Sequence, residues 1–464
     1  MPAGSVSTVK ETAFQGQKTI DRRDEVLPPL WVQSHNLSHE ANPVRGWNGS
    51  RVSPIDSDGS VRTKLVDIVD EADQVVCVCS FIIADKSVVE ALLRAGSRGV
   101  RVYLLTASEN LLLKESKMDS EFDAERLRDH IETLRSVAGR ILVRTSEHFH
   151  SKFVLADPNG RNPRGYLLTA NLTAEALTRN VELAVELTVP EVQDLFKQFL
   201  IGFWKESSSE LLDKGGLSKV EPIASGRIES PKNIPCTTSE VHTLRSTADR
   251  LIEDARNEII VSSFGFDLQH ETVQKLVAAA TAGKNVHVFA RPRPSKSTMD
   301  ALVALRKAGA VVRGHPWLHA KCLVVDTERG WTGLVMTANF EKRGLDEGFE
   351  TGVILRDKDA MTMLDFAESW KERFPLELFV DRRVGQVDGE ATLWKDGELR
   401  KVTIGKKGKT DLHEFRVKKV EEVAGFEPDF TRVVEGGLEI FQEHTFVWTV
   451  LAPRPEDTAE SKTT

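Results

Sequence analysis

The sequence lacks any apolar run long enough to cross a bilayer. Its longest near-continuous apolar stretch, from Val75 to Ala84, falls far short of the roughly 20 residues that a membrane-spanning helix needs, and it predicts a buried strand instead. The segment from Met1 to Arg23 is polar and has no apolar core of a secretion signal. We therefore expect a cytoplasmic protein without a membrane anchor.

Cysteine is scarce as well. Cys77, Cys79, Cys236 and Cys322 are the four in 464 residues, which is too few and too scattered for a disulfide framework. Cys77 and Cys79 fall on one face of the predicted strand, so we expect reduced core residues rather than a zinc site with its recognisable ligand spacing. The sequence predicts no metal and no cofactor.

The chain also has no excess of positive charge. Its formal net charge of −8 argues against a protein that coats nucleic acid through overall charge. A local basic groove remains compatible with that total, because phosphate contacts need only nearby Lys and Arg. With 40% hydrophobic and 28% charged residues, the composition is that of a soluble globular protein, and the length predicts two or three domains.

What the sequence does contain is a second copy of itself. The segment IVDEADQVVCVCSF from Ile68 matches LIEDARNEIIVSSF from Leu251, and in both a helix end precedes a strand that closes on Ser-Phe. Each strand is followed by an amphipathic helix, a glycine, a second strand, a further helix and a third strand. The helices are predicted at 86–98 and 121–137 in the first copy and at 271–282 and 297–308 in the second.

Both copies then carry the same polar residues at the same spacing. A histidine is followed two residues later by lysine and seven residues later by aspartate, in HSKFVLAD and again in HAKCLVVD. An asparagine and a glutamate, eleven residues apart, follow in each copy. Chance does not preserve these spacings twice, so the duplication identifies catalytic candidates. They are His150, Lys152, Asn171 and Glu182, and their counterparts His319, Lys321, Asn339 and Glu350.

The order of elements predicts an α/β fold with two α/β/α repeats packed about a pseudo-two-fold axis. Towards the C-terminus, short strands with Gly-containing turns predict a small β domain. The predicted units are an N-terminal extension (1–58), the first repeat (59–213), a linker rich in Gly, Ser and Pro (214–236), the second repeat (237–377), the β domain (378–452) and a disordered tail (453–464).

The duplicated residues suit a substrate with a tetrahedral anionic centre. Positions i and i+2 of a strand face the same side, so each histidine is expected to project beside its lysine. Lys and Asn can hold non-bridging oxygens, while one imidazole attacks and the other protonates the leaving group. A nucleophilic histidine needs a carboxylate on its other ring nitrogen, and Glu182 and Glu350 are the duplicated candidates. The reaction indicated is phosphodiester cleavage.

The arrangement H-x-K-x4-D, with a small residue before Asn and a later Glu, closely resembles the phospholipase D superfamily over roughly residues 60 to 375. The resemblance implies one active site at the junction of the halves, a phosphohistidine intermediate and no metal. It also implies that His150 is the nucleophile and His319 the general acid that later activates water. Where the family usually has Gly-Ser, this chain has Thr169-Ala170 and Thr337-Ala338, which predicts the loss of one hydroxyl contact per half.

Other polar residues near the motifs have competing interpretations. Asp157 and Asp326 fall at predicted strand ends, where a turn role explains them as well as chemistry does, so we leave them out of the catalytic set. Arg291, Arg293 and Lys296 follow a strand of the second copy and are predicted to contact substrate phosphate; the alternative is a solvated basic loop. Residues that flank the motifs, as pocket lining or as ordinary packing, are His148, His315 and Trp317.

The phosphodiester is predicted to be that of a nucleic acid. The absent anchor, the basic loop and the added β domain favour a nuclease that cleaves DNA or RNA. The alternative is a phospholipase D or phosphatidyltransferase that acts on phospholipid head groups. A binding protein on an inactivated fold is disfavoured because both motifs are intact. Nucleases of this superfamily often work with a helicase or other ATPase, so the resemblance makes such a partner an expectation, and a homo-oligomer is left open.

Overall fold

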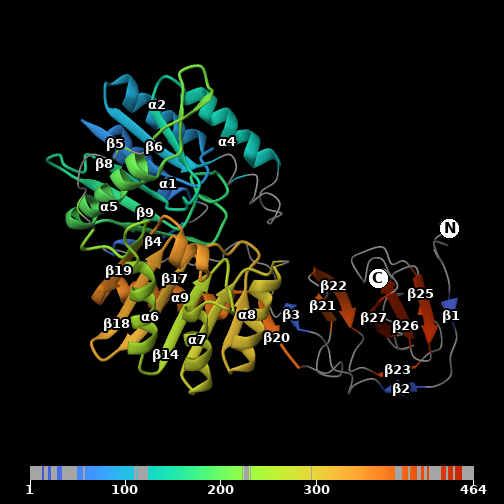
Figure 1. Cartoon of the computed structure of the whole chain (residues 1–464). Helices are drawn as coiled ribbons and strands as arrows, with labels where there is room; N and C mark the ends of the chain where they lie inside the picture. Colours follow the sequence, from blue (N-terminus) through green and yellow to red (C-terminus); the bar gives the residue numbers. More distant parts are fainter. Residues whose placement is uncertain are drawn as a thin grey trace.

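The computed structural model describes residues 29–33 and 50–381, apart from 56–57, 109–111, 113–123, 222, 224–228, 230 and 294, and the backbone of strands at 13–14, 19–21 and within 389–451. Two large mixed sheets dominate the chain, one in each repeat, with the first repeat drawn above the second in Figure 1. The predicted α/β fold with two repeats is confirmed.

The first repeat is built on a nine-stranded sheet in the order β12-β11-β7-β6-β5-β8-β9-β10-β4. Its three central strands β5, β6 and β7 are parallel, and the remaining pairs are antiparallel. The strands are β4 (Val52–Ile55), β5 (Val75–Cys79), β6 (Arg101–Ala107), β7 (Leu142–Ser146), β8 (Phe153–Ala156), β9 (Arg164–Leu168), β10 (Glu182–Glu186), β11 (Ser209–Leu211) and β12 (Leu217–Lys219). The helices are α1 (Ser60–Asp70), α2 (Lys86–Ser97), α4 (Ala124–Val137), α5 (Val189–Ile201) and the π-helical η1 (Gly202–Glu206).

The second repeat follows the same plan in an eleven-stranded sheet, ordered β13-β19-β18-β17-β14-β15-β16-β20-β3-β21-β22. Its strands are β13 (Cys236–Thr237), β14 (Glu258–Ser263), β15 (Asn285–Ala290), β16 (Val311–Gly314), β17 (Cys322–Thr327), β18 (Gly330–Met336), β19 (Glu350–Arg356), β20 (Leu376–Phe379), β3 (Leu30–Gln33), β21 (Gly389–Lys395) and β22 (Glu398–Ile404). Its helices are α6 (Thr243–Asp254), α7 (Glu271–Thr281), α8 (Lys296–Lys307), α9 (Asp357–Arg373) and the π-helical η2 (Arg343–Glu347). Smaller sheets pair β1 (Ala13–Phe14) with β24 (Phe415–Arg416), β2 (Thr19–Asp21) with β23 (Lys409–Asp411), and β25 (Phe430–Val434), β26 (Gly437–Gln442) and β27 (Thr445–Leu451) with one another.

Local sequence explains where these helices begin and end. The side chain of Asp85 accepts a hydrogen bond from the Val88 amide at the start of α2, and Ser295 does the same for Thr298 in α8. The helices α2 and α7 both end before a glycine with positive φ, Gly99 at 89° and Gly283 at 86°, a conformation that suits glycine best. Both helices therefore turn sharply into the next parallel strand, as the duplicated pattern predicts.

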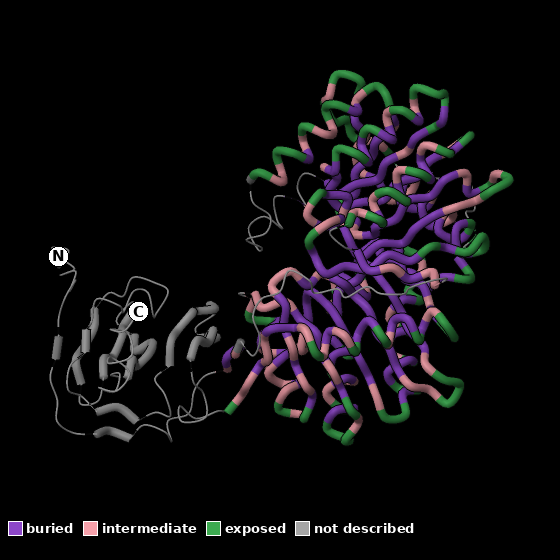
Figure 2. The backbone as a smooth tube through the Cα atoms, turned by 180° about the vertical axis from the view of Figure 1, so that it is seen from behind, coloured by how far each residue is buried: buried purple, intermediate pink, exposed green. Residues whose placement is uncertain are grey.

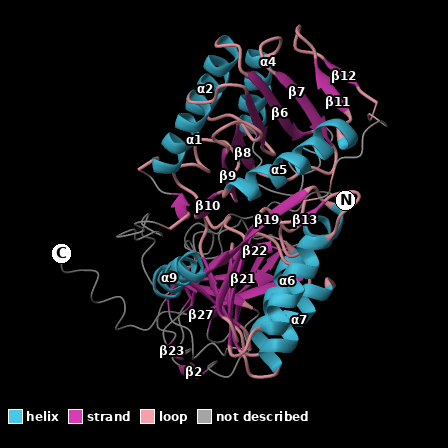
Figure 3. Cartoon of the chain, turned by 90° about the vertical axis from the view of Figure 1, so that its left-hand side faces the viewer, coloured by secondary structure: helices cyan, strands magenta, loops and turns pink. Residues whose placement is uncertain are grey.

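The two sheets face each other across a shared hydrophobic core. This core contains Phe149 and Phe199 from the first repeat together with Phe349 and Trp370 from the second, all at most 1% exposed. Two further cores lie on the outer faces, one under α1 and α2 and the other under α6, α7 and α8. Buried residues accordingly run through both sheets and across the junction in Figure 2, and α5 lies at the level where the repeats meet in Figure 3. The arrangement places the sheet junction, rather than either repeat alone, at the centre of the fold.

The segment before the first repeat completes both sheets. Its strand β4 pairs with β10, and its strand β3 lies between β20 and β21. Next to β4, the guanidinium of Arg51 binds Glu191 of α5 at 2.6 Å and Asp359 of α9 at 3.0 Å, which ties together one helix of each repeat. Strands β3 and β4 thus belong to the repeats' sheets, although the segment 1–58 was predicted to be a separate extension.

The C-terminal prediction needs a similar refinement. Strands are present between 389 and 451, but β21 and β22 extend the second repeat's sheet through β3, whereas β25, β26 and β27 form a sheet of their own. The predicted tail, 453–464, lies outside the described residues. All four cysteines are buried and unpaired, as predicted. None of the helices in the described ranges combines the length and the hydropathy that spanning a bilayer requires.

Candidate active site

A cavity of about 700 Å³ opens between the two repeats. Its lining includes six of the eight duplicated candidates, and three come from each repeat. They are His150, Asn171 and Glu182, and His319, Asn339 and Glu350. The two lysines do not line the cavity but are fully buried beside the histidines. The fold therefore brings together residues that lie in two separate parts of the sequence.

Backbone hydrogen bonds between the repeats fix the two histidines. The amide of His150 donates to the carbonyl of Phe349 at 3.2 Å, and the amide of His319 donates to the carbonyl of Val181 at 3.0 Å. Phe349 and Val181 each directly precede the duplicated glutamate of their own repeat. Each histidine is consequently held against the strand that carries the other repeat's glutamate.

The histidine and glutamate side chains pair across the junction. Nδ1 of His150 lies 2.8 Å from Oε1 of Glu350, and Nδ1 of His319 lies 2.6 Å from Oε1 of Glu182. Both glutamates are at most 2% exposed, whereas the histidine side chains are 24% and 14% exposed. A carboxylate on Nδ1 orients the ring and leaves Nε2 as the nitrogen available for chemistry. Both glutamates contact a histidine ring nitrogen, as their predicted role requires. Because each pair combines residues of both repeats, neither repeat alone holds a complete pair.

The threonines that replace the family's Gly-Ser support these glutamates. Thr169 donates a hydrogen bond to Oε2 of Glu182 at 2.5 Å, and Thr337 donates to Oε2 of Glu350. The predicted loss of one hydroxyl contact per half is therefore wrong in this respect, because each hydroxyl contacts the carboxylate instead. The threonine lies two residues before the asparagine and directly after the strand that pairs with the glutamate's strand, where its hydroxyl reaches the buried oxygen.

The lysines adopt a different arrangement from the predicted one. Strands β8 and β17 begin only after Lys152 and Lys321, so the i and i+2 alternation of a strand does not apply. Instead, Nζ of each lysine donates to the carbonyl of its own histidine, at 2.5 Å for Lys152 and 2.7 Å for Lys321. Burial lowers the pKa of Lys152 to about 7 and that of Lys321 to about 8. Both ammonium groups thus remain beside the imidazoles, close to losing their charge near neutrality.

The two histidine–glutamate pairs differ electrostatically. Burial and the ammonium of Lys152 lower the pKa of His150, and burial with Lys321 and Lys152 lowers that of His319 well below its usual value. Burial raises the pKa of Glu182 to about 7. Burial would also raise the pKa of Glu350, but His150 and Lys152 outweigh it and the net shift is downward. Glu350 is therefore ionised near neutrality, whereas Glu182 can hold a proton.

The asparagines are placed alike but bonded differently. Oδ1 of Asn171 is buried without a hydrogen-bond partner among the described residues. In the second repeat, Oδ1 of Asn339 accepts from Ser263 at 3.3 Å and Nδ2 donates to Oε1 of Glu341 at 3.2 Å. Glu341 lines the cavity, but the repeat pattern does not reveal it, because its counterpart two residues after Asn171 is Thr173.

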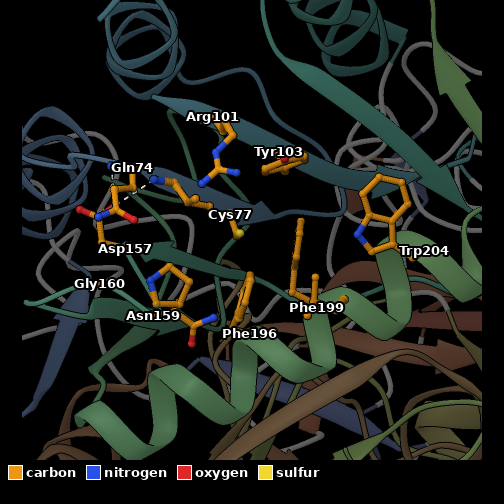
Figure 4. Close-up of a pocket in the computed structure, with 13 residues that line it drawn as sticks. Gln74, Cys77, Arg101, Tyr103, Asp157, Asn159, Gly160, Phe196, Phe199 and Trp204 are labelled. Atoms are coloured by element: carbon orange, nitrogen blue, oxygen red, sulfur yellow. Dashed lines mark hydrogen bonds between the residues drawn. The ribbon is translucent and has the colours of Figure 1, made fainter. Parts of the chain in front are cut away.

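Asp157 and Asp326 both have a structural role; Asp157 directly follows β8, whereas Asp326 lies within β17 rather than in the expected turn. The carboxylate of Asp157 accepts from the amides of Gln74 and Val75, both at 2.8 Å, and Asp326 accepts from the Asn257 amide at 2.9 Å. Neither aspartate lines the catalytic cavity. Figure 4 shows Asp157 bound to Gln74 beside a separate pocket of about 210 Å³ lined by aromatic side chains. These aspartates fix the entry into β5 and β14, so their repeated spacing has a structural cause.

The basic loop lies partly in the cavity. Arg293 and Lys296 line it, and Arg291 is close enough to His319 to lower its pKa. Both arginines lie over the ring of Phe264, at 4.2 Å for Arg293 and 5.6 Å for Arg291. Lys296 is 78% exposed and pairs with Asp300 at 2.5 Å. To contact a phosphate, Lys296 would first have to break this ion pair with Asp300. Contact of these residues with substrate stays a prediction.

The flanking residues divide between the two predicted roles. His148 lines the cavity, and its carbonyl accepts from the Phe349 amide at 2.6 Å. His315 is 1% exposed and packs against Phe374 and Trp317, with ring centroids at 5.2 and 5.5 Å. His148 is therefore part of the site wall, whereas His315 packs in the core.

The described residues include no cluster of three or more His, Cys, Asp or Glu side chains placed to hold a metal ion. The chemistry that the site itself offers is that of two oriented imidazoles, two buried ammonium groups and two carboxamides around one cavity. These groups can attack a phosphorus atom, protonate a leaving oxygen and stabilise negative charge.

Comparison with known proteins identifies both repeats. A family model described as "Cardiolipin synthase, PLD-like domain" matches residues 65–204 and 249–374, which together make up more than half of the chain. Among curated proteins, none matches the sequence.

The chain has weak similarities to several solved structures. A polyphosphate kinase from Porphyromonas gingivalis is 16% identical over 68% of this chain and 49% of its own, with a TM-score of 0.46, so this chain spans about half its length. A phosphatidylserine synthase from Haemophilus influenzae Rd KW20 is 12% identical over 78% and 91% of the two chains, with a TM-score of 0.47. Nuc, a phospholipase D family member from Salmonella typhimurium, is 21% identical over 34% and 95%, with a TM-score of 0.27. At these values no substrate transfers from them to this chain.

Proposed function

Since this chain belongs to the phospholipase D superfamily through two domains that match the family model, we propose that it is a metal-independent phosphodiesterase that cleaves nucleic acid. The observation that carries the proposal is the exchange of carboxylates, in which each cavity histidine is oriented by the other repeat's buried glutamate. This exchange supports one shared site in which the two imidazoles act on the same phosphate.

In the proposed mechanism His150 is the nucleophile. Nε2 of His150 attacks the phosphorus, the bond from phosphorus to the leaving oxygen breaks, and His319 gives its proton to that oxygen. His319 then removes a proton from water, which attacks the phosphorus and breaks the bond to His150. The order of roles is supported by the ionised Glu350, which orients His150, while burial and Lys152 lower the pKa of His150 and favour its neutral form. It is also supported by the pair of Glu182 and His319, which can hold a proton near pH 7.

Charge stabilisation is assigned to the lysines and asparagines. Lys152 and Lys321 place positive charge beside the imidazoles in a fully buried environment, where electrostatic effects are stronger than in water. The Asn171 and Asn339 carboxamides line the cavity from opposite repeats and can donate to the non-bridging oxygens. Because these groups supply the stabilisation, the proposed reaction needs no divalent ion.

A nucleic acid is the proposed substrate because the cavity is lined by cations from both repeats. Arg293, Lys296, Lys342 and Arg343 line it on the side of the second repeat, and Arg126 on the side of the first. Besides the motif glutamates, carboxylates also line it, namely Glu175, Asp267, Glu341 and Glu347. None of the large apolar side chains that are strongly exposed in the described residues lines the cavity. This pattern suits a polyanion better than acyl chains.

The family model's description favours a second candidate, transfer or hydrolysis at phospholipid head groups. The two candidates share the same chemistry and differ in the group attached to phosphate. The proposed cytoplasmic location and a helicase or ATPase partner accompany the nuclease candidate only, and both remain predictions.

The test combines substrate and intermediate. The purified protein is incubated, with excess chelator, with labelled single-stranded DNA, RNA and phospholipid vesicles, and quenched samples are examined for acid-labile, alkali-stable phosphate on the protein. We expect cleavage of nucleic acid unaffected by the chelator, and a label that is lost in the His150→Ala variant. A strict requirement for Mg²⁺ or Mn²⁺ contradicts the mechanism, and cleavage of vesicles alone selects the second candidate.

A further inference from the structure

One difference between the two halves of the cavity is a carboxylate beside the asparagine. Two residues after each asparagine, the first repeat has Thr173 and the second has Glu341, and both line the cavity. Glu341 accepts a hydrogen bond from Nδ2 of Asn339 at 3.2 Å, whereas Asn171 has no such acidic neighbour two residues on. The pseudo-two-fold symmetry of the site is thus broken at a position that can contact substrate.

The fold makes room for this carboxylate. Gly265 lies beside Glu341, and a Cβ atom added to Gly265 would come within 3.1 Å of Oε2. The equivalent residue of the first repeat is Ile82, since Ser80-Phe81 and Ser263-Phe264 precede the two positions. The second repeat therefore has Gly265 and Glu341 where the first has Ile82 and Thr173. The small residue accompanies the larger one, which leaves space for the carboxylate.

The carboxylate also changes the charge of the site. Of the glutamates beside the buried lysines, Glu182 and Glu350 are each committed to a histidine, whereas Glu341 hydrogen-bonds the neutral carboxamide of Asn339. Glu341 is close enough to Lys321 to favour its charged form. Glu341 consequently adds one negative charge that the motif residues do not provide, next to the positive charge of Arg293, which also acts on Lys321.

We propose that Glu341 is a specificity-determining residue that admits singly charged phosphodiesters and rejects doubly charged phosphomonoesters. A phosphodiester carries one negative charge, whereas a phosphomonoester carries about 1.5 to 2 at neutral pH. Coulomb repulsion by a fixed carboxylate grows in proportion to ligand charge, so it costs a monoester about twice the free energy that it costs a diester. The inference rests on the proposed function, because it assigns a selection rule to the same phosphate site.

The experiment compares two ligands that differ by one methyl group and one charge. Binding of methyl phosphate and dimethyl phosphate is measured by titration calorimetry at pH 7, below the pKa of about 8 of Lys321. The proteins compared are the wild type and Glu341→Gln, which keeps an acceptor for Asn339 but removes the charge. We expect Glu341→Gln to tighten dimethyl phosphate about threefold and methyl phosphate about tenfold, since doubling the repulsion squares the fold-change. Glu341→Thr, which introduces the first repeat's residue, should tighten the two ligands by the same factors as Glu341→Gln. Glu341→Asp keeps the charge and should keep the wild-type preference for dimethyl phosphate.

A matched control removes the same charge from the cavity rim. Glu347 also lines the cavity, but it is 51% exposed and pairs with Lys342 at 2.5 Å, so Glu347→Gln should change either affinity by less than about twofold. Equal tightening of both ligands in Glu341→Gln, no tightening, or failure of the wild type to bind dimethyl phosphate would each overturn the inference. Turnover of nucleic acid is measured separately. Absence of that turnover would contradict the proposed nuclease function, whereas the binding data test the role of Glu341.

Discussion

Nδ1 of His150 and Oε1 of Glu350 lie 2.8 Å apart, although 200 positions separate the two residues in the chain. The reciprocal pair of His319 and Glu182 spans 137 positions. Each repeat therefore supplies the imidazole of one pair and the carboxylate of the other. Removing either repeat's contribution should disable both halves of the reaction.

The first prediction concerns this shared site. The variants His150→Ala and His319→Ala should each reduce turnover to background, and the double variant should be little worse, because residues that act as a unit are not additive. The measurement is single-turnover cleavage of labelled DNA with circular dichroism as the folding control. Retention of about half the activity by either single variant would indicate two independent sites.

The second prediction concerns the orientation of His150. Glu350→Gln keeps the shape of the side chain but replaces the ionised acceptor, so kcat should fall about 10²- to 10⁴-fold because the correct tautomer and the charge disappear. Thr337→Val removes only the hydroxyl that holds Glu350, and we expect a smaller decrease of about 10- to 100-fold, as for outer residues that orient a ligand. If both variants lose activity equally, the carboxylate's charge is not what matters.

The third prediction is an alkaline limb in the pH profile. The pKa values of Lys152 and Lys321 are lowered to about 7 and about 8, and that of Glu182 is raised to about 7, so all three groups lose their protons between pH 7 and 8 in the free protein. The disappearance of two positive charges and of the proton shared with His319 should therefore decrease kcat/KM above this range. Because kcat/KM reports the free enzyme, it is the quantity to measure, from pH 5.5 to 9.5. A constant kcat/KM up to pH 9 would contradict the assignment.

The fourth prediction concerns salt and the basic loop. DNA binding to His150→Ala should weaken steeply with salt, because cations that neutralise phosphates release counterions. Replacing Arg291, Arg293 and Lys296 by Ala should flatten the slope by up to about one unit for each phosphate that is no longer neutralised. The smallest contribution is expected from Lys296, which is paired with Asp300.

The control for the fourth prediction removes the same number of charges elsewhere. Arg250, Arg256 and Arg329 line a separate hollow that also contains Thr327, at the end of β17 remote from His319. Their triple replacement by Ala should leave the slope nearly unchanged. An equal effect of both triple variants would show that net charge, and not the loop, governs binding.

The sequence predicts the architecture well because duplication tests each feature twice. Helices at 86–98 and 271–282 appear as α2 and α7 with ends shifted by one residue, and the repeat pattern alone picks out the eight motif residues. The sequence does not reveal which glutamate serves which histidine, since Glu182 is nearer to His150 in the chain but pairs with His319 in space. That choice depends on the docking of the two sheets, which local spacing does not encode.

Two other features are hidden in the sequence for different physical reasons. Strands β3 and β4 are four residues long, too short to show an alternating pattern, and their pairing partners lie far along the chain. Glu341 is hidden because it is the unduplicated residue at a duplicated position. Duplication therefore locates the shared chemistry, while the residues that differ between copies have to be found from the structure.

The exchange of carboxylates also has a consequence during protein synthesis. A growing chain folds its N-terminal part first, so the first repeat can form its sheet before the second repeat is made. At that stage His150 is present without Glu350, and Glu182 without His319. Joining partners so distant in the chain carries a loop-closure cost that only the docked repeats offset. An unfinished chain is therefore expected to lack activity until both pairs have formed.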